Sequence, residues 1–140
     1  MATLAQEKLN EALVNTYTVV ALGATTEGYP VDLDGADNTV NNVAAFADNA
    51  IGVALDTAVA GAAVRVALAG AGVVKCCVGT NGTTFGLPQR FDSGGGDGVT
   101  DATVGTGTNK CVVVGQALQT GTVGALVGVN LGAFSFTVGA

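Results

Sequence analysis

Two segments of the chain repeat one another without a gap, and this repeat limits the folds that the sequence can adopt. The first begins at Ile51 and reads IGVALDTAVAGAAVRVALA, and the second begins at Val114 and reads VGQALQTGTVGALVGVNLG. The shared positions are Gly52, Ala54, Leu55, Thr57, Gly61, Ala62, Val64, Val66 and Leu68 in the first copy and Gly115, Ala117, Leu118, Thr120, Gly124, Ala125, Val127, Val129 and Leu131 in the second. Because two copies are too few for a solenoid, we expect a compact sheet or barrel.

Side chains that we expect to face the core alternate along both copies with smaller or polar ones. A period of two residues is typical of a strand with one buried face. Each copy is therefore predicted to form a strand, a glycine-bearing connection and a second strand. The expected core residues of the repeat are Ile51, Leu55, Val64, Val66 and Leu68 in the first copy and Leu118, Val127, Val129 and Leu131 in the second.

The predicted fold class is mainly β, with a compact small barrel of short strands. The chain contains 22 glycines, which favour tight turns between such strands. Further strand candidates are Tyr17–Leu22, Val73–Val78, Thr83–Leu87, Lys110–Val114 and Phe134–Val138.

The start of the chain differs from the rest. Residues 1–42 are expected to form an N-terminal arm, and residues 43–140 a β-rich body that contains the repeat at 51–69 and 114–132. Met1–Asn15 is expected either as a short helix, with Thr3 and Gln6 as its capping box, or as a flexible terminus. Thr25–Asn42 is rich in Gly, Asp, Asn and Thr and is predicted to be an extended loop.

The charge and the distribution of polar residues argue against two kinds of partner, nucleic acid and membrane. The net charge of −6 with only five basic residues disfavours nucleic acid, whose phosphates require Lys and Arg. The segment Cys111–Ala140 carries no charge, but Gln116, Gln119 and Asn130 interrupt its apolar run, and a buried amide is costly in lipid. We therefore expect neither a nucleic-acid partner nor a membrane span.

No motif in the sequence predicts catalysis, a metal or a cofactor. The chain has no His, so its three cysteines, Cys76, Cys77 and Cys111, lack the usual catalytic base and are expected to be reduced and buried. The acidic segment Asp32–Asp37 does not match the EF-hand spacing of calcium ligands. A weak cation site in Asp92–Asp101 stays open, whereas Gly105–Lys110 lacks the end of a phosphate loop. The prediction is a protein that is not an enzyme.

The repeated phrase Gly52-x-Ala54-Leu55, followed by Gly61, Val64, Val66 and Leu68 and restated from Gly115 to Leu131, resembles the small capsid decoration (cement) proteins of tailed bacteriophages. Those chains are also rich in Ala, Gly and Val, and the resemblance covers about Val43 to Gly132. This chain departs from them in its longer N-terminal segment and in the tail Ala133–Ala140.

The resemblance implies a β-tulip-like fold and a homotrimer on the exterior of the capsid, where it binds between subunits of the major capsid protein and stabilises the shell. It also implies an N-terminal arm that adds a strand to the shell. Residues of this arm proposed to contact the capsid are Leu4, Leu9, Leu13, Tyr17, Val19 and Tyr29. Because the N-terminus does not resemble a signal peptide, we expect synthesis in the host cytoplasm.

Two other classes of protein remain open from the sequence. A different phage structural subunit, such as a tail tube or a head fibre, would share the β-rich and weakly charged composition. An adhesin module that recognises host glycans is a second alternative, although the chain has no Trp and only two Tyr to form a sugar-binding platform.

Overall fold

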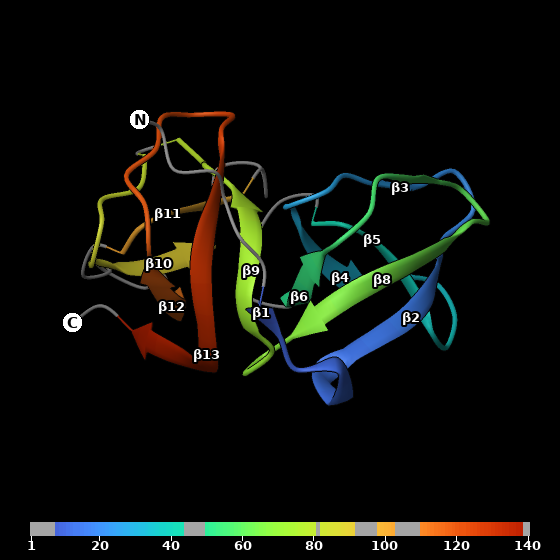
Figure 1. Ribbon diagram of the computed structural model, residues 1–140. Coiled ribbons are helices and arrows are strands. Elements are labelled where there is room, and N and C mark those ends of the chain that lie inside the picture. Colours follow the sequence, from blue (N-terminus) through green and yellow to red (C-terminus); the bar gives the residue numbers. More distant parts are fainter. Residues whose placement is uncertain (1–7, 44–49, 81, 92–97, 103–109, 139–140) are drawn as a thin grey trace.

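The first half of the chain forms a closed β-barrel (Figure 1). The computed structural model describes residues 8–43, 50–80, 82–91, 98–102 and 110–138. The barrel strands are β2 (Val14–Val19), β4 (Pro30–Leu33), β5 (Thr39–Asn42), β6 (Ala50–Ala54) and β8 (Ala63–Leu68), in the order β2-β5-β4-β6-β8. A parallel contact between β2 and β5 closes the barrel, and β3 (Ala24–Thr25) and β7 (Ala58–Val59) form a short ribbon. The interior of the barrel is filled by small apolar side chains: Val19, Val31, Val40, Ala54, Val64 and Val66.

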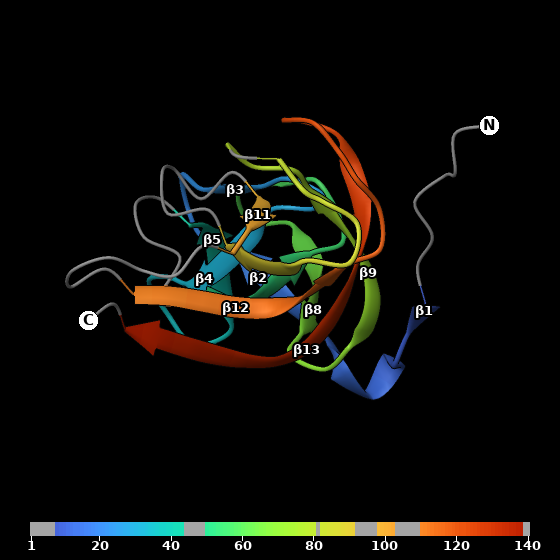
Figure 2. The same ribbon diagram turned by 90° about the vertical axis from the view of Figure 1, so that its left-hand side faces the viewer.

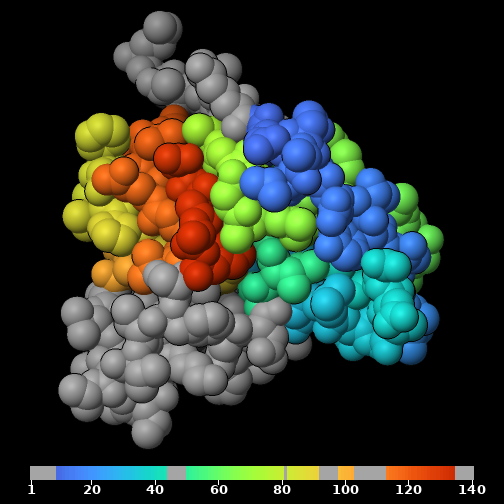
Figure 3. Space-filling view, turned by 90° about the horizontal axis from the view of Figure 1, so that it is seen from below, coloured from blue at the N-terminus to red at the C-terminus, as the bar shows by residue number. Residues whose placement is uncertain are grey.

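The second half forms a six-stranded sheet in the order β1-β9-β13-β12-β10-β11. Its strands are β1 (Lys8–Leu9), β9 (Gly72–Cys77), β10 (Pro88–Phe91), β11 (Val99–Asp101), β12 (Lys110–Ala117) and β13 (Leu126–Val138). The sheet curls, because a parallel bridge between Val78 and Val99 brings the end of β9 back to β11. In Figure 2, which faces this half, β12 and β13 lie side by side along one wall. The N-terminal strand β1 pairs with β9, and in the view from below in Figure 3 the blue N-terminal residues lie against the yellow-green residues of the middle of the chain.

The two halves are copies of one fold with the same strand register. In the first half Gly52 pairs with Leu68 and Ala54 with Val66. In the second half Gly115 pairs with Leu131 and Ala117 with Val129, which are the equivalent positions of the sequence repeat. The parallel contact of Val19 with Val40 recurs as the bridge of Val78 with Val99.

The duplication extends well beyond the repeat found in the sequence. The segment Thr25–Pro30 reads TTEGYP, and Thr83–Pro88 reads TTFGLP. In the first, the Gly28 N–H donates to Ala54 O at 2.8 Å, and in the second the Gly86 N–H donates to Ala117 O at 2.8 Å. Both β4 and β10 have a register shift after their second residue. We therefore call residues 14–68 repeat 1 and residues 73–131 repeat 2.

The repeats share a hydrophobic core. Val43, Val53, Leu55 and Ala67, on the outside of the first barrel, pack in one cluster with the interior residues of repeat 2. The Cys77 N–H also donates to Gly28 O across the boundary at 2.9 Å. The chain is thus one body in which a closed barrel shares its core with a sheet that the Val78–Val99 bridge curls into a second, barrel-like unit, called the second barrel below. This confirms the predicted mainly β fold with a small barrel.

The predicted arm of residues 1–42 is wrong for the residues that the structure describes. Strands β2, β4 and β5 belong to the first barrel, so Thr25–Asn42 is not an extended loop. Strands β4 and β5 were not recognised in the sequence because each carries few large apolar residues. Asn and Thr side chains in this region instead tie strands together. Asn42 Oδ1, for example, accepts the Thr26 N–H at 3.2 Å.

The predicted N-terminal helix is also wrong within the described part. Residues 8–15 form β1, a 3₁₀ turn at Glu11–Leu13 and the start of β2, and the capping box at Thr3 and Gln6 lies outside the described residues. At the C-terminal end, the strand candidate Phe134–Val138 continues β13 rather than forming a strand of its own. No helix in the described ranges is long and apolar enough to cross a membrane.

Candidate functional site

One interface inside the chain shows how this fold binds a neighbour of its own kind. Repeat 1 contributes an outer surface of buried side chains, which we call the contact face: Val43, Val53, Leu55 and Ala67. Repeat 2 contributes one end of its barrel interior, which we call the mouth: Val74, Cys76, Phe91, Val114 and Leu131. Every residue of both sets is at most 5% exposed, so the interface excludes water.

The equivalent contact face of repeat 2 is uncovered by any described residue. Its residues Gln116, Leu118 and Asn130 take the places of Val53, Leu55 and Ala67, and all three are exposed. Phe85 and Leu87 stand beside them, because the Phe85 N–H donates to Thr120 Oγ1 and the Ala117 N–H to Leu87 O. Phe85 is 70% exposed and Leu118 is 40% exposed. These apolar side chains make the end of repeat 2 a candidate docking surface.

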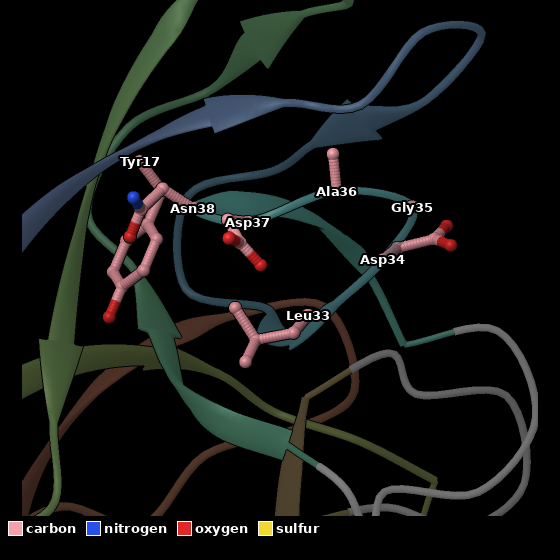
Figure 4. Close-up of a pocket in the computed structure, with 7 residues that line it drawn as sticks. All are labelled: Tyr17, Leu33, Asp34, Gly35, Ala36, Asp37 and Asn38. Atoms are coloured by element: carbon pink, nitrogen blue, oxygen red, sulfur yellow. The ribbon is translucent and has the colours of Figure 1, made fainter.

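The equivalent mouth of repeat 1 is likewise open. Its residues are Asn15, Tyr17, Leu33, Ile51 and Leu68, none of which is fully buried. Leu33 is 58% exposed, whereas its counterpart Phe91 is 2% exposed. Tyr17 and the turn Leu33–Asn38 line a hollow of about 550 Å³ beside this mouth, with Tyr17 on one side and Leu33 on the other (Figure 4).

The acidic turn at this hollow holds no arrangement for a metal. Among the residues that the structure describes, no group of three or more His, Cys, Asp or Glu side chains converges. The turn is instead closed by its own hydrogen bonds, with the Ala36 N–H donating to Thr39 Oγ1 at 3.0 Å. Burial, and then the nearby charge of Asp34, raise the pKa of Asp32. Most of the Asp92–Asp101 segment lies outside the described residues.

One carboxylate in each repeat ties neighbouring segments together, although the two do not occupy equivalent positions. In repeat 1, Asp56 accepts the Arg65 backbone N–H at 3.1 Å and the Arg65 guanidinium at 2.8 Å. In repeat 2, Asp101 accepts the Thr84 hydroxyl at 2.6 Å and Gln89 Nε2 at 2.8 Å. Hydrogen bonds from Arg65 lower the pKa of Asp56. Partial burial alone would raise the pKa of Asp101, but its hydrogen bonds outweigh this and lower it.

These lowered pKa values predict an acid-sensitive fold. A carboxylate whose pKa is lower in the folded chain stabilises it above the unfolded pKa of about 3.9, and this contribution is lost as the pH falls through the folded value. We expect the variant Asp56→Asn/Asp101→Asn to lose less thermal stability than the wild type between neutral pH and about pH 3. Thermal unfolding followed by circular dichroism across this range measures the difference. Parallel curves for the two proteins would contradict the prediction.

The residues predicted for capsid binding fall in different environments. Leu4 lies outside the described residues. Leu9 and Leu13 pack against the shared core, and Tyr17 and Tyr29 are half-buried. Val19 is 1% exposed inside the first barrel, so it is not a docking residue.

The predicted repeat-core residues are buried or partly buried, with one exception. Leu55, Val64, Val66, Val127, Val129 and Leu131 are buried, and Ile51 and Leu68 pack against the interior of the first barrel. Leu118 was predicted as core and is exposed, because repeat 2 has no further repeat against it. The exposed pair Phe85 and Leu87 was missed. The phrase T-T-x-G-x-P that contains them would have shown their equivalence to Glu27 and Tyr29.

The geometry defines a class of protein: two tandem copies of one small β-barrel fold joined through one shared core, with an exposed, partly apolar surface on each. No family model matches the chain, and no curated protein matches its sequence. Among solved structures, the chain is similar to the head fibre gp8.5 N base of bacteriophage phi29. The match has a TM-score of 0.58 and 14% sequence identity, and it covers 84% of this chain and 92% of that chain. At this identity the likeness establishes a common fold.

Proposed function

We propose that this chain is a structural protein of a phage virion that binds the outside of the capsid, between subunits of the major capsid protein, as a homotrimer. Its role is mechanical: it joins neighbouring capsid subunits and stabilises the shell, with no catalytic step and no cofactor. The observation that carries this proposal is the fold shared with a phage head fibre base over most of both chains. The resemblance of the repeated strand phrase to capsid decoration proteins supports it independently.

The surface of the chain suits this role. Its net charge of −6 disfavours nucleic acid as a ligand. Exposed apolar side chains lie at the end of repeat 2 instead: Phe85 and Leu87 are on a segment that hydrogen bonds join to the segment of Leu118. Such patches mark surfaces through which proteins associate with one another. Weak contacts of three chains in a trimer act together, so that modest individual contacts give firm attachment.

A head-fibre base is the second candidate, and the similarity to the head fibre base of phi29 favours it directly. The two roles differ in what they do to the shell. A cement protein raises the temperature at which empty shells fall apart, whereas a fibre base attaches without changing it. Thermal disassembly of shells with and without the bound chain separates the two.

The binding test uses the full chain and empty shells of the major capsid protein encoded in the same genome. We expect the chain to co-sediment with the shells and to saturate. Absence of co-sedimentation at protein concentrations well above micromolar would overturn the proposed function.

Deletion of residues 1–7 tests the remaining part of the predicted arm. A longer deletion of Met1–Asn15 would also remove Leu9, Leu13 and Val14, which pack against the shared core, and would destabilise the fold. The shorter deletion removes only residues outside the described part of the chain. We expect it to weaken shell binding by about tenfold or more, because three arms are lost per trimer. Unchanged binding of this variant, at an unchanged melting temperature, would show that no arm contributes.

A further inference from the structure

The internal interface leaves one contact face and one mouth without a partner. Repeat 1 covers the mouth of repeat 2, and repeat 2 covers the contact face of repeat 1. The contact face of repeat 2 and the mouth of repeat 1 remain exposed in the described structure. We propose that they bind each other between copies of this chain, so that the contact face of repeat 2 in one copy seats against the mouth of repeat 1 in the next. This contact deepens the proposed function, because it supplies the interface of the homotrimer.

The open mouth of repeat 1 has the chemistry of a covered one. In repeat 2 this layer is formed by Cys76, Phe91, Val114 and Leu131, all at most 2% exposed because repeat 1 packs on them. In repeat 1 the same positions carry Tyr17, Leu33, Ile51 and Leu68, which are mainly apolar, while the remaining mouth position changes from buried Val74 to exposed Asn15. Removal of such aliphatic side chains from water favours association.

The uncovered contact face of repeat 2 keeps a central apolar residue and becomes more polar around it. Leu118 stands where Leu55 is buried, while Gln116 and Asn130 replace Val53 and Ala67. Phe85, which replaces Glu27, adds a large apolar side chain beside them. An apolar centre with a polar surround is the usual pattern of an interface that must also tolerate water before assembly.

In repeat 2 a side chain replaces one hydrogen bond that repeat 1 makes with the adjacent repeat. In repeat 1 the Gly28 carbonyl accepts the Cys77 N–H of the adjacent repeat at 2.9 Å. In repeat 2 the equivalent Gly86 carbonyl accepts Gln116 Nε2 at 2.7 Å. Gln116 thus satisfies in the single chain a carbonyl whose counterpart is satisfied by the next barrel.

One segment of each free surface lies toward an opposite end of the molecule. The segment between β9 and β10, which carries Phe85 and Leu87, lies at the left end of Figure 1, and the turn between β4 and β5 lies at the right end. Contacts between unlike surfaces propagate from copy to copy. They close into a ring when the rotation between successive copies is a full turn divided by a whole number, which is three for a trimer. The proposed trimer is such a ring.

The test uses two variants that each destroy one surface. Phe85→Asp/Leu118→Asp disables the contact face of repeat 2, and Leu33→Asp disables the mouth of repeat 1. All three side chains are exposed in the single chain, so the fold is expected to persist. Val59→Asp is the matched control, because Val59 is 73% exposed and lies outside both surfaces. Sedimentation velocity and native mass spectrometry measure the oligomeric state, and circular dichroism checks the fold. Leu33→Ser replaces Leu33→Asp if the latter unfolds.

We expect the wild type and Val59→Asp to form the same closed oligomer, and each surface variant alone to be monomeric. An equimolar mixture of the two surface variants is expected to form a one-to-one dimer, since one intact surface of each kind remains. Self-association of either surface variant, or a mixture that stays monomeric while the wild type assembles, would overturn the head-to-tail contact. A monomeric wild type would overturn it as well. Failure to sediment with shells overturns only the proposed function.

Discussion

Gly115→Ala is expected to lower the free energy of unfolding by about 3 kcal/mol. A Cβ atom at this position would stand 2.0 Å from the backbone oxygen of Asn130 on the paired strand β13. Backbone cannot move aside as a flexible side chain can, so β12 and β13 would have to separate. Gly52 in repeat 1 is in the same situation, 2.1 Å from the Ala67 oxygen, and Gly52→Ala is expected to have the same effect. Urea unfolding of each variant measures the loss.

Gly132→Ala is the control for this experiment. No atom lies within 4 Å of a Cβ built at Gly132, which also belongs to β13. Its substitution is expected to change stability by no more than about 0.5 kcal/mol. If Gly115→Ala were as harmless as Gly132→Ala, the close approach of strands β12 and β13 would be wrong.

Leu55→Ala and Leu118→Ala are expected to differ sharply, although the two leucines occupy equivalent positions. Leu55 is 5% exposed within the shared core, and its truncation is expected to cost about 3 kcal/mol through lost burial and a cavity. Leu118 is 40% exposed, and the same change is expected to cost under about 1 kcal/mol in the single chain. Urea unfolding at protein concentrations low enough to keep the chain monomeric provides the comparison.

Equal losses for the two leucine variants would contradict the asymmetry of the interface between the repeats. A large loss confined to Leu118→Ala would reverse the order of burial. The pair therefore tests which barrel covers which, independently of any partner.

The repeated strands could be predicted from sequence because their side chains alternate visibly. Val64 and Val66 point into the first barrel and Val127 and Val129 into the second, as a period of two residues predicts. Strands β4 and β5 were missed because they are short and partly polar, and Thr39–Asn42, for example, buries only one apolar side chain, Val40. Strand β5 is equivalent to β11, but few of their residues are identical, and a one-residue gap before Thr83 shifts the alignment.

The exposure of equivalent residues could not be predicted from alternation alone. Ala67 occupies a position predicted to face solvent and is fully buried, because the neighbouring barrel lies on it. Leu118 occupies a position predicted to face the core and is exposed, because no barrel lies on it. Both outcomes depend on how the two repeats pack, which is information that neither copy of the repeat contains.

Fusion of the two barrels in a single polypeptide frees each of them from being identical to the other. In an assembly of separate identical barrels, one amino acid would have to serve at every equivalent position, whether dry or wet. Here the buried position holds Val53 and its exposed equivalent holds Gln116, and the buried Ala67 is matched by the exposed Asn130. Joining the copies therefore lets a symmetric architecture have two chemically different ends.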